Sequence, residues 1–399
     1  MFNNNRTTNL LLASVLLFAF TANAQNKNKE AGKLAEDMAK TIMVKWPDSL
    51  THEKGKPAKW SYDLGVFFKG MEGIYKRNHD EKYIKYMQHI MDLFVQPNGE
   101  IDRYSLESYN IDYVKNGSVL LFLYKQTKEE KYKQAASYLR EQLKTHPRTK
   151  EGGFWHKKVY PHQMWLDGIY MGQPFYAEWS AIFNEPENFN DIANQFILLN
   201  KHAKDPKTGL LYHGWDESKE QLWANKETGT SLNFWGRAMG WYGIALVDVL
   251  EFFPIEHPKR KVLEEILQEF ANAIKKVQGN NGLWYQVLDK QNEKGNYPEA
   301  SASNMFVYTL AKGVRLGVLP KNYISVAKTG FSGVKKTFLE KDSNGLLHLN
   351  GTVQVSGLGG KPYRSGSYDY YLSEPVIQDD PKGMGAFIMA ANEMAMIRK

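Results

Sequence analysis

A single carboxylate lies in the middle of an apolar and aromatic stretch of this sequence. Residues 162–172 read H-Q-M-W-L-D-G-I-Y-M-G, so Asp167 has Trp165, Leu166 and Tyr170 as near neighbours. Burying an ionised carboxylate costs free energy unless the group is paired or protonated. Apolar surroundings raise the pKa of an aspartate, and a carboxyl that keeps its proton near neutral pH can act as a general acid.

Other side chains that could do chemistry also lie in aromatic strings. Asp112 lies in Y-N-I-D-Y, His156 ends G-G-F-W-H and His213 lies in L-L-Y-H-G-W-D, while Arg237 and Trp241 belong to F-W-G-R-A-M-G-W. Each has an ordinary structural interpretation: an aspartate can cap a helix, a histidine can hydrogen-bond within the core, and an arginine can tie two helices together. They matter as a set, because all of them lie in or beside loops that we expect to converge.

Several common catalytic patterns do not occur in the sequence. It has no phosphate-binding P-loop, no G-x-S-x-G and no H-E-x-x-H. It also has no cysteine, and its ten histidines do not show zinc-like spacing. We therefore predict neither a metal nor a cofactor.

The segments that must position these side chains are mainly helical. Apolar residues recur at helical spacing in residues 118–125, 131–143, 186–200, 238–253, 262–277, 304–316 and 383–396. Strand-like alternation is confined to short pieces, such as residues 345–355.

A glycine followed by an apolar or aromatic pair recurs between these segments. The glycines are Gly99, Gly153, Gly209, Gly282 and Gly345, and each interval is long enough for one helical hairpin with its loops. Hairpins of this kind must pack on one another to bury their apolar faces. We predict an all-α fold, an (α/α)6 barrel in which six hairpins form a toroid and the loops meet at one mouth. An open solenoid of the tetratricopeptide type is the alternative, which the irregular spacing and long loops disfavour.

The N-terminus has the pattern of a secretory signal peptide. Arg6 precedes the apolar run 10–20, and T-A-N-A ends at residue 24, so we expect residues 1–24 to be removed and residues 25–399 to form a single catalytic domain. Without a cysteine for lipid attachment, the mature protein is expected in the periplasm or secreted, as a monomer or weak homodimer. The formal charge of +7 is spread along the chain. It indicates an acidic polysaccharide as partner, and neither nucleic acid nor membrane.

Five strings together resemble the unsaturated rhamnogalacturonyl hydrolases, glycoside hydrolase family 105. They are W-S-Y-D-L-G-V-F-F-K-G-M (60–71), W-L-D-G-I-Y-M-G (165–172), F-W-G-R-A-M-G-W (234–241), A-S-A-S-N-M-F-V-Y-T-L-A-K-G-V-R-L-G (300–317) and Y-Y-L-S-E-P-V-I-Q-D-D-P-K-G-M-G-A-F (370–387). The resemblance implies an (α/α)6 barrel and an exo-acting enzyme. Such an enzyme removes a terminal 4,5-unsaturated uronic acid from oligosaccharides made by polysaccharide lyases.

The resemblance also implies a set of site residues. Asp167 takes the position of the catalytic acid/base and Asp112 that of a second essential acid. The residues expected to bind substrate are Tyr62, His156, Trp165, His213, Arg237 and Trp241. Arg237 is our choice for the uronate carboxylate, because a guanidinium matches that geometry.

A 4,5-unsaturated uronic acid is a vinyl ether, so its C4 is basic. Protonation at C4 makes an oxocarbenium-like centre at C5, water attacks there, and the resulting hemiketal opens and expels the aglycone. We expect Trp165 and Tyr170 to desolvate Asp167 and keep it protonated, with repulsion from Asp112 adding to the effect. Two alternatives stay open: an unsaturated glucuronyl hydrolase acting on other acidic polysaccharides, and a non-catalytic glycan-binding protein.

Overall fold

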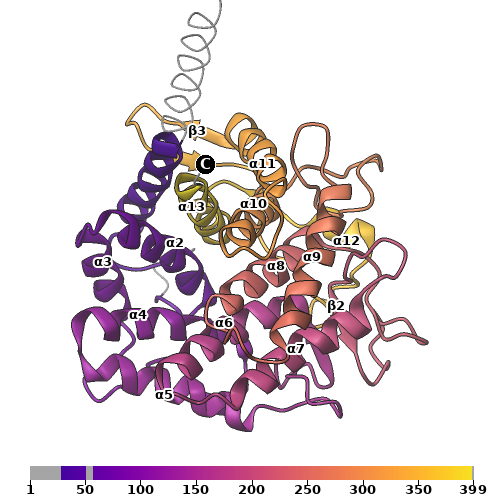
Figure 1. Cartoon of the computed structure of the whole chain (residues 1–399), viewed down its shortest axis with the longest axis horizontal. Coiled ribbons are helices and arrows are strands. Elements are labelled where there is room, and N and C mark those ends of the chain that lie inside the picture. The colour runs from indigo at the N-terminus through magenta and orange to yellow at the C-terminus, as the bar shows by residue number, and fades with distance from the viewer. Residues whose placement is uncertain (1–27, 51–56, 398–399) are drawn as a thin grey trace, which may run out of the picture.

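Two concentric rings of helices make up the protein. The computed structural model describes residues 28–50 and 57–397 (Figure 1). The predicted signal peptide, residues 1–24, lies outside the described residues. The inner helices are α2 (Tyr62–Asn78), α4 (Gly117–Thr127), α6 (Leu166–Ile182), α8 (Gly236–Leu250), α10 (Ala300–Arg315) and α13 (Pro381–Met396). The outer helices are the one over residues 28–45, α3 (Lys82–Met91), α5 (Glu130–Thr145), α7 (Asn188–Ala203), α9 (Arg260–Lys276) and α11 (Tyr323–Thr337).

The inner ring closes on itself. Each inner helix packs against the next, and α13 packs against α2. Glycines allow this last contact: a Cβ on Gly70 would lie 2.8 Å from the side chain of Ile388, and one on Gly385 would lie 2.8 Å from the backbone nitrogen of Phe67. A closed ring excludes the open solenoid and confirms the predicted (α/α)6 barrel.

The recurring glycines are turn residues. Gly99, Gly209, Gly282 and Gly345 have positive φ angles of 82°, 77°, 83° and 76°, a backbone conformation that glycine adopts without strain. In the second occurrence of this glycine pattern, G-G-F-W-H, the turn residue is Gly152, with φ 92°, and not the predicted Gly153. Each turn follows an outer helix and precedes the next inner helix.

The connections at the two ends of the barrel differ in length. Those that lead from an outer helix to the next inner helix are long, and they span residues 92–116, 146–165, 204–235, 277–299 and 338–380. Those that lead back from an inner helix to the next outer helix are short, for example residues 79–81 and 128–129. The inner helices therefore all begin at one end, which carries the long loops and which we call the mouth.

Short strands and short helices order the long loops. β1 (Gln163–Trp165) pairs with β2 (Gly214–Asp216), β3 (Leu339–Lys341) with β4 (Leu347–Leu349), and β5 (Thr352–Val353) with β6 (Val376–Ile377), all antiparallel. The short helices are η1 (Leu106–Ser108), η2 (Ile111–Asn116) and α12 (Tyr368–Ser373). β4 and β5 confirm the strand-like pattern predicted for residues 345–355.

The helix prediction missed the helix over residues 28–45 and also α2, α3, α6 and α11. In α6, nearly every residue from Gly168 to Ser180 is buried, so the helix lacks the polar face on which a helical period depends. It also contains Pro174 and two glycines, which lower helix propensity in isolation. Tertiary burial overrides that propensity. The remaining predicted helices are confirmed with small shifts of their ends.

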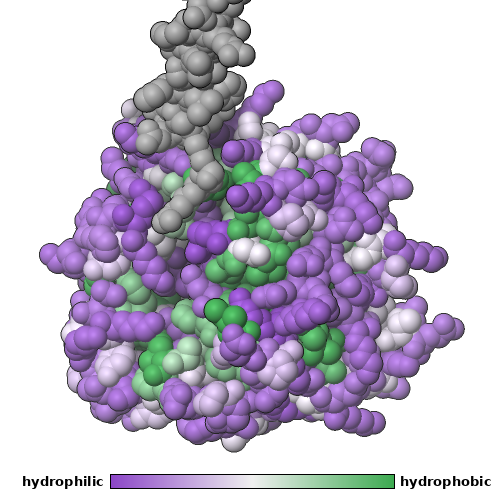
Figure 2. Space-filling view, in the orientation of Figure 1, coloured by the Kyte–Doolittle hydropathy of each residue, from purple (hydrophilic) through white to green (hydrophobic). Residues whose placement is uncertain are grey.

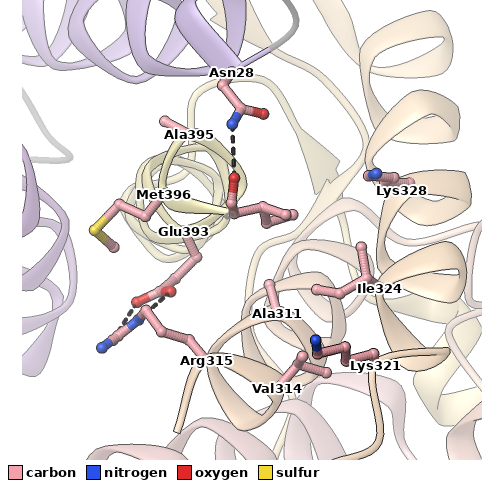
Figure 3. A pocket seen from close by; sticks show the side chains of 11 residues that line it. Asn28, Ala311, Val314, Arg315, Lys321, Ile324, Lys328, Glu393, Ala395 and Met396 are labelled. Atoms are coloured by element: carbon pink, nitrogen blue, oxygen red, sulfur yellow. Dashed lines mark hydrogen bonds and ion pairs between the residues drawn. The ribbon is translucent and has the colours of Figure 1, made fainter. Parts of the chain in front are cut away.

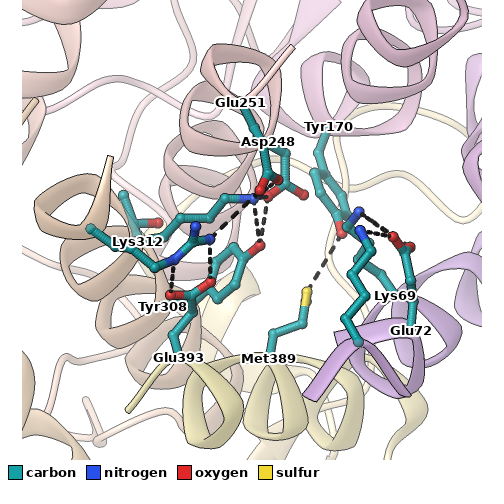
Figure 4. A network of polar contacts seen from close by, with 12 residues as sticks. Lys69, Glu72, Tyr170, Asp248, Glu251, Tyr308, Lys312, Met389 and Glu393 are labelled. Atoms are coloured by element: carbon teal, nitrogen blue, oxygen red, sulfur yellow. Dashed lines mark hydrogen bonds and ion pairs between the residues drawn. The ribbon is translucent and has the colours of Figure 1, made fainter. Parts of the chain in front are cut away.

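Ion pairs close the barrel at the end opposite the mouth (Figure 4). Lys312 Nζ lies 2.7 Å from both Asp248 Oδ1 and Glu251 Oε2, and the Arg315 guanidinium makes two hydrogen bonds to Glu393. Burial alone would lower the pKa of Lys312, but Asp248 and Glu251 raise it above its ordinary value. The ammonium group therefore stays charged although the side chain is buried.

A groove of about 980 Å³ lies at this same end (Figure 3). It is lined by the last turns of α10 and α13, for instance by Val314 and Met396, and by Ile324 of α11. None of the predicted site residues lines it. The face shown in Figure 2 is largely hydrophilic, with smaller hydrophobic areas near its centre. Within the described residues, every helix is too short or too polar to cross a membrane.

Candidate active site

Backbone pairing in the mouth loops brings His213 to Asp167. The ladder between β1 and β2 places Trp165 opposite Gly214. The next backbone NH, that of Leu166, donates to the carbonyl of His213 at 3.0 Å. Asp167 follows in the first turn of α6, so residues far apart in the sequence become neighbours.

A second pair of backbone bonds brings Asp112 to the same place. The NH of His156 donates to the carbonyl of Gln163 at 2.7 Å, and the NH of Ile111 donates to the carbonyl of His156 at 3.2 Å. Asp112 comes next, at the start of η2, where its NH is capped by the side chain of Asn110. Four predicted site residues, Asp112, His156, Asp167 and His213, are thus gathered by main-chain geometry.

The Asp167 carboxylate faces an imidazole. Its Oδ2 lies 3.1 Å from His213 Nε2, and the other ring nitrogen of His213 lies 2.7 Å from the Tyr371 hydroxyl. His213 is fully buried, whereas 14% of the Asp167 side chain stays exposed. Asp167 is therefore accessible at the surface of an otherwise closed cluster.

The pKa of Asp167 is lowered, which contradicts the prediction. Burial raises this pKa, but the charge and hydrogen-bonding capacity of His213, the charge of His156 and a backbone hydrogen bond together outweigh burial. The position of Asp167 at the N-terminus of α6 favours the anion as well. The prediction that apolar neighbours keep Asp167 protonated is wrong for the free protein, because it neglected the histidines that the fold brings close.

Asp112 has partners of its own. Its Oδ2 lies 2.6 Å from Lys157 Nζ, and its Oδ1 lies 3.6 Å from His156 Nε2. Burial lowers the pKa of His156 to about 4, so this ring is neutral at neutral pH. The repulsion that we predicted between Asp112 and Asp167 is not among the leading influences on the pKa of Asp167. Asp112 is paired with Lys157 instead.

Aromatic rings form one wall of the site. His156 stacks on Trp165 with ring centroids 4.3 Å apart, and Tyr160 stacks on Trp165 at 4.9 Å. The Arg364 guanidinium lies 5.8 Å from the rings of both Tyr160 and Trp165, and it donates to the Tyr160 hydroxyl at 2.8 Å. Trp165 is only 5% exposed and His156 4%, so the half-buried Tyr160 is the most accessible ring of this wall. Direct contact of Trp165 with a sugar stays a prediction.

Two other predicted site residues, Tyr62 and Trp241, lie in contact with each other. Their rings meet edge to face with centroids 6.3 Å apart, and Tyr170 stacks on Trp241 at 5.0 Å. Burial raises the pKa of Tyr62 well above its usual value, as do Asp63 and Asp112. Tyr62 is the more accessible of the two, since Trp241 is 1% exposed. A stacking role for Trp241 stays a prediction, because Tyr170 covers one of its faces.

Arg237 makes structural contacts. Its Nη1 donates to the Val353 carbonyl at 2.6 Å and its Nη2 to the Gln354 carbonyl at 3.1 Å, and only 1% of the residue is exposed. The guanidinium thus ties α8 to the loop that begins at β5. The predicted contact with a uronate carboxylate remains untested, and the observed bonds favour a positioning role.

Four residues of the site were not predicted from the sequence: Lys157, Tyr160, Tyr371 and Arg364. Lys157 directly follows His156, and Tyr371 lies in the Y-Y-L-S-E-P string. Both could have been predicted because they lie next to or within motifs that the sequence analysis had already singled out. Tyr160 and Arg364 lie in irregular loops without any periodic pattern. Among residues 28–50 and 57–397, no group of three or more acidic or histidine side chains is arranged to hold a metal ion.

The closed double ring, with Asp167 in the first turn of α6 and His213 brought beside it by the loop that carries β2, is an arrangement that suits a glycoside hydrolase of the (α/α)6 class. The family model described as Glycosyl Hydrolase Family 88 matches residues 34–398, and the chain belongs to this family. The resemblance to glycoside hydrolase family 105 is confirmed as well, because a solved family 105 enzyme from C. acetobutylicum is 47% identical. That comparison has a TM-score of 0.88 and covers 91% of this chain and 99% of that chain.

Two curated proteins are also similar. The 24.9 kDa protein in the picA locus of Rhizobium radiobacter is 40% identical over 235 residues, which are 57% of this chain and 100% of that protein. The unsaturated rhamnogalacturonyl hydrolase YesR of Bacillus subtilis is 29% identical over 250 residues, which are 61% of this chain and 68% of YesR.

Proposed function

We propose that this protein hydrolyses the unsaturated uronic acid from the non-reducing end of oligosaccharides that a rhamnogalacturonan lyase has released. The observation that carries the proposal is the partly exposed carboxyl of Asp167, whose Oδ2 lies 3.1 Å from Nε2 of the buried His213. The similarity to YesR supports the choice of rhamnogalacturonan fragments.

Asp167 supplies the proton that the reaction needs at C4. In the free protein its carboxyl favours the anion, so substrate must change the balance. The bound sugar displaces water and brings the uronate charge close, and both effects raise the pKa of a neighbouring carboxyl. When His213 carries a proton on Nε2, it can transfer this proton to the Asp167 carboxylate, 3.1 Å away. The carboxyl then passes this proton to C4, and an oxocarbenium-like centre forms at C5.

The same carboxyl serves in the second half of the reaction. Once ionised, Asp167 accepts a proton from the water that attacks C5. The hemiketal that results opens and releases the aglycone. A route through a single acid/base differs from ordinary glycoside hydrolysis, in which two carboxyls flank the anomeric bond. We infer that Asp112 binds ring hydroxyls and does not transfer protons, which its ion pair with Lys157 supports.

The proposal is tested on a panel of unsaturated disaccharides. The panel contains a rhamnogalacturonan-lyase product and products of glycosaminoglycan lyases, and the ultraviolet absorbance of the C4=C5 bond is followed with each. We expect the largest kcat/KM with the rhamnogalacturonan product. Preference for a glycosaminoglycan product would assign the chain to the glucuronyl specificity, and glycan binding without loss of absorbance would make it a binding protein.

Export and oligomeric state remain predictions from the sequence. We infer removal of residues 1–24 and a location in the periplasm or outside the cell. Sequencing the N-terminus of the protein from each cell fraction tests both inferences, and light scattering tests the prediction of a monomer or weak homodimer.

A further inference from the structure

A small cavity lies against His156. Its volume is about 10 Å³, and it is lined mainly by apolar side chains of α6 and the mouth loops. Its polar lining comes from His156, Gln173 and Gln195. A volume of roughly this size is the smallest that holds one water molecule, which also needs two to four polar partners.

Two of these residues carry buried polar atoms that need partners. Within the described part of the chain, His156 Nδ1 has no hydrogen-bond partner, and neither does the oxygen or the nitrogen of the Gln173 amide. His156 is 4% exposed and Gln173 is 1% exposed. Leaving a buried polar atom unsatisfied costs about 1–3 kcal/mol, so three such atoms around one cavity indicate a shared partner.

Gln195 is different, because its amide already has partners. Its oxygen accepts from the NH of Phe154 at 2.8 Å, and its nitrogen donates to the Gly152 carbonyl at 3.0 Å and to Asp191 at 2.9 Å. Gln195 therefore only lines the cavity. Gln173 is the lining residue whose amide oxygen and nitrogen have no partner among the described residues.

The protonation pattern of His156 follows from its other nitrogen. Nε2 lies 3.6 Å from a carboxylate oxygen of Asp112, so the neutral ring is stable when Nε2 carries the hydrogen. Nδ1 must then accept a hydrogen bond. A hydroxyl, an amide N–H or a water can donate such a bond. No protein donor of the described residues reaches Nδ1, and the cavity has room for one water.

We propose that this cavity holds one ordered water that donates to His156 Nδ1 and is itself held by the Gln173 amide. Gln173 is then a positioning residue: through the water it fixes the tautomer in which His156 presents an N–H toward Asp112 and the substrate. The inference rests on the role of His156 in the proposed function, but the water and the tautomer can be observed without substrate.

Replacing Gln173 with Met tests this proposal, since Gln173→Met keeps the side-chain volume and removes both polar atoms. Nitrogen NMR of protein labelled on histidine reads the state of each ring nitrogen. In the wild type we expect His156 to show a hydrogen on Nε2 and a hydrogen-bonded Nδ1. In the variant we expect the Nδ1 signal to move toward that of a nitrogen without a hydrogen bond, and kcat/KM to fall about tenfold, the scale of one lost hydrogen bond.

The matched control is Tyr83→Phe, which removes another buried polar atom without a partner among the described residues, on the outer helix α3. It should leave the His156 signals and the activity unchanged. An unchanged Nδ1 signal in Gln173→Met would overturn the proposal, as would a wild-type crystal structure at high resolution without density in the cavity. If Gln173→Met does not fold, the wild-type spectrum and density decide alone. A protein inactive on every substrate would refute the proposed function. The His156 nitrogen signals and the density in the cavity could still be measured in such a protein, so the two failures are distinguishable.

Discussion

The Oδ2 atom of Asp167 lies 3.1 Å from Nε2 of His213. These two groups share one environment, so the charge on one determines how readily the other holds a proton. The lowered pKa leaves Asp167 ionised in the free protein, without a proton to donate. A second anion close to a carboxylate raises its pKa and so favours the protonated form. Under the proposed function, proton donation by Asp167 would therefore depend on the charge of the bound uronate.

Asp167→Asn should remove activity and leave the fold intact. The amide keeps the shape of the side chain but cannot donate or accept the catalytic proton, and general acid–base help contributes about 10²–10⁴-fold in rate. We expect kcat on an unsaturated disaccharide to fall by at least this factor, with an unchanged circular dichroism spectrum. Turnover near the wild-type rate in the folded variant would exclude Asp167 as the acid.

Tyr371→Phe should weaken catalysis through His213. The Tyr371 hydroxyl lies 2.7 Å from His213 Nδ1, and this contact orients the ring that faces Asp167. One neutral hydrogen bond contributes about 1 kcal/mol, so kcat should fall by roughly fivefold. The kinetic pH profile should shift together with kcat. A loss confined to KM would place Tyr371 in substrate binding.

Arg237→Met separates two roles for this arginine. A residue that only ties β5 to α8 should cost about 3 kcal/mol of unfolding free energy when removed, because it leaves the Val353 and Gln354 carbonyls without their charged donor. Urea denaturation measures this cost. A residue that binds the uronate carboxylate should instead raise KM and leave stability unchanged. We expect the first result.

Lys312→Met should destabilise the far end of the barrel. The substitution leaves Asp248 and Glu251 without their shared cation, and removing one partner from a buried ion pair costs about 3–5 kcal/mol. Lys261→Met is the control, since its pair with Glu265 is 3.9 Å long and mostly exposed. Urea midpoints of both variants test the difference. Equal midpoints would show that the buried network does not stabilise the fold.

Stability should fall as the pH drops from about 6.5 to 4. Burial lowers the pKa values of His146 and His156 to about 4, whereas the unfolded chain binds these protons near pH 6.5. The unfolded state therefore takes up more protons within this window, so each histidine should cost about 2 kcal/mol of unfolding free energy between pH 7 and pH 5. His146→Gln should remove its share of the pH dependence, as urea denaturation at the two pH values would show. The same slope in the variant and the wild type would contradict the assignment.

The sequence was enough to predict the ring of hairpins and most of the residues gathered at the mouth. The recurring glycines and the amphipathic outer helices, such as α9, carry signals that depend only on local spacing. The pKa of Asp167 could not be predicted, because it depends on His213, which a strand ladder brings close from another loop. The contacts of Arg237 were missed for the same reason: its partners lie on β5, and nothing near it in the sequence indicates that strand.

The unequal lengths of the connections have a consequence for how this protein can change. Residues 79–81 and 128–129 are the whole connection between one helix and the next, so insertions there would disturb the rings. The loops that lead into the inner helices already carry long excursions, each anchored by a glycine turn before the next helix begins. New substrate preferences can therefore arise by lengthening or exchanging these loops, while the scaffold beneath them keeps its shape.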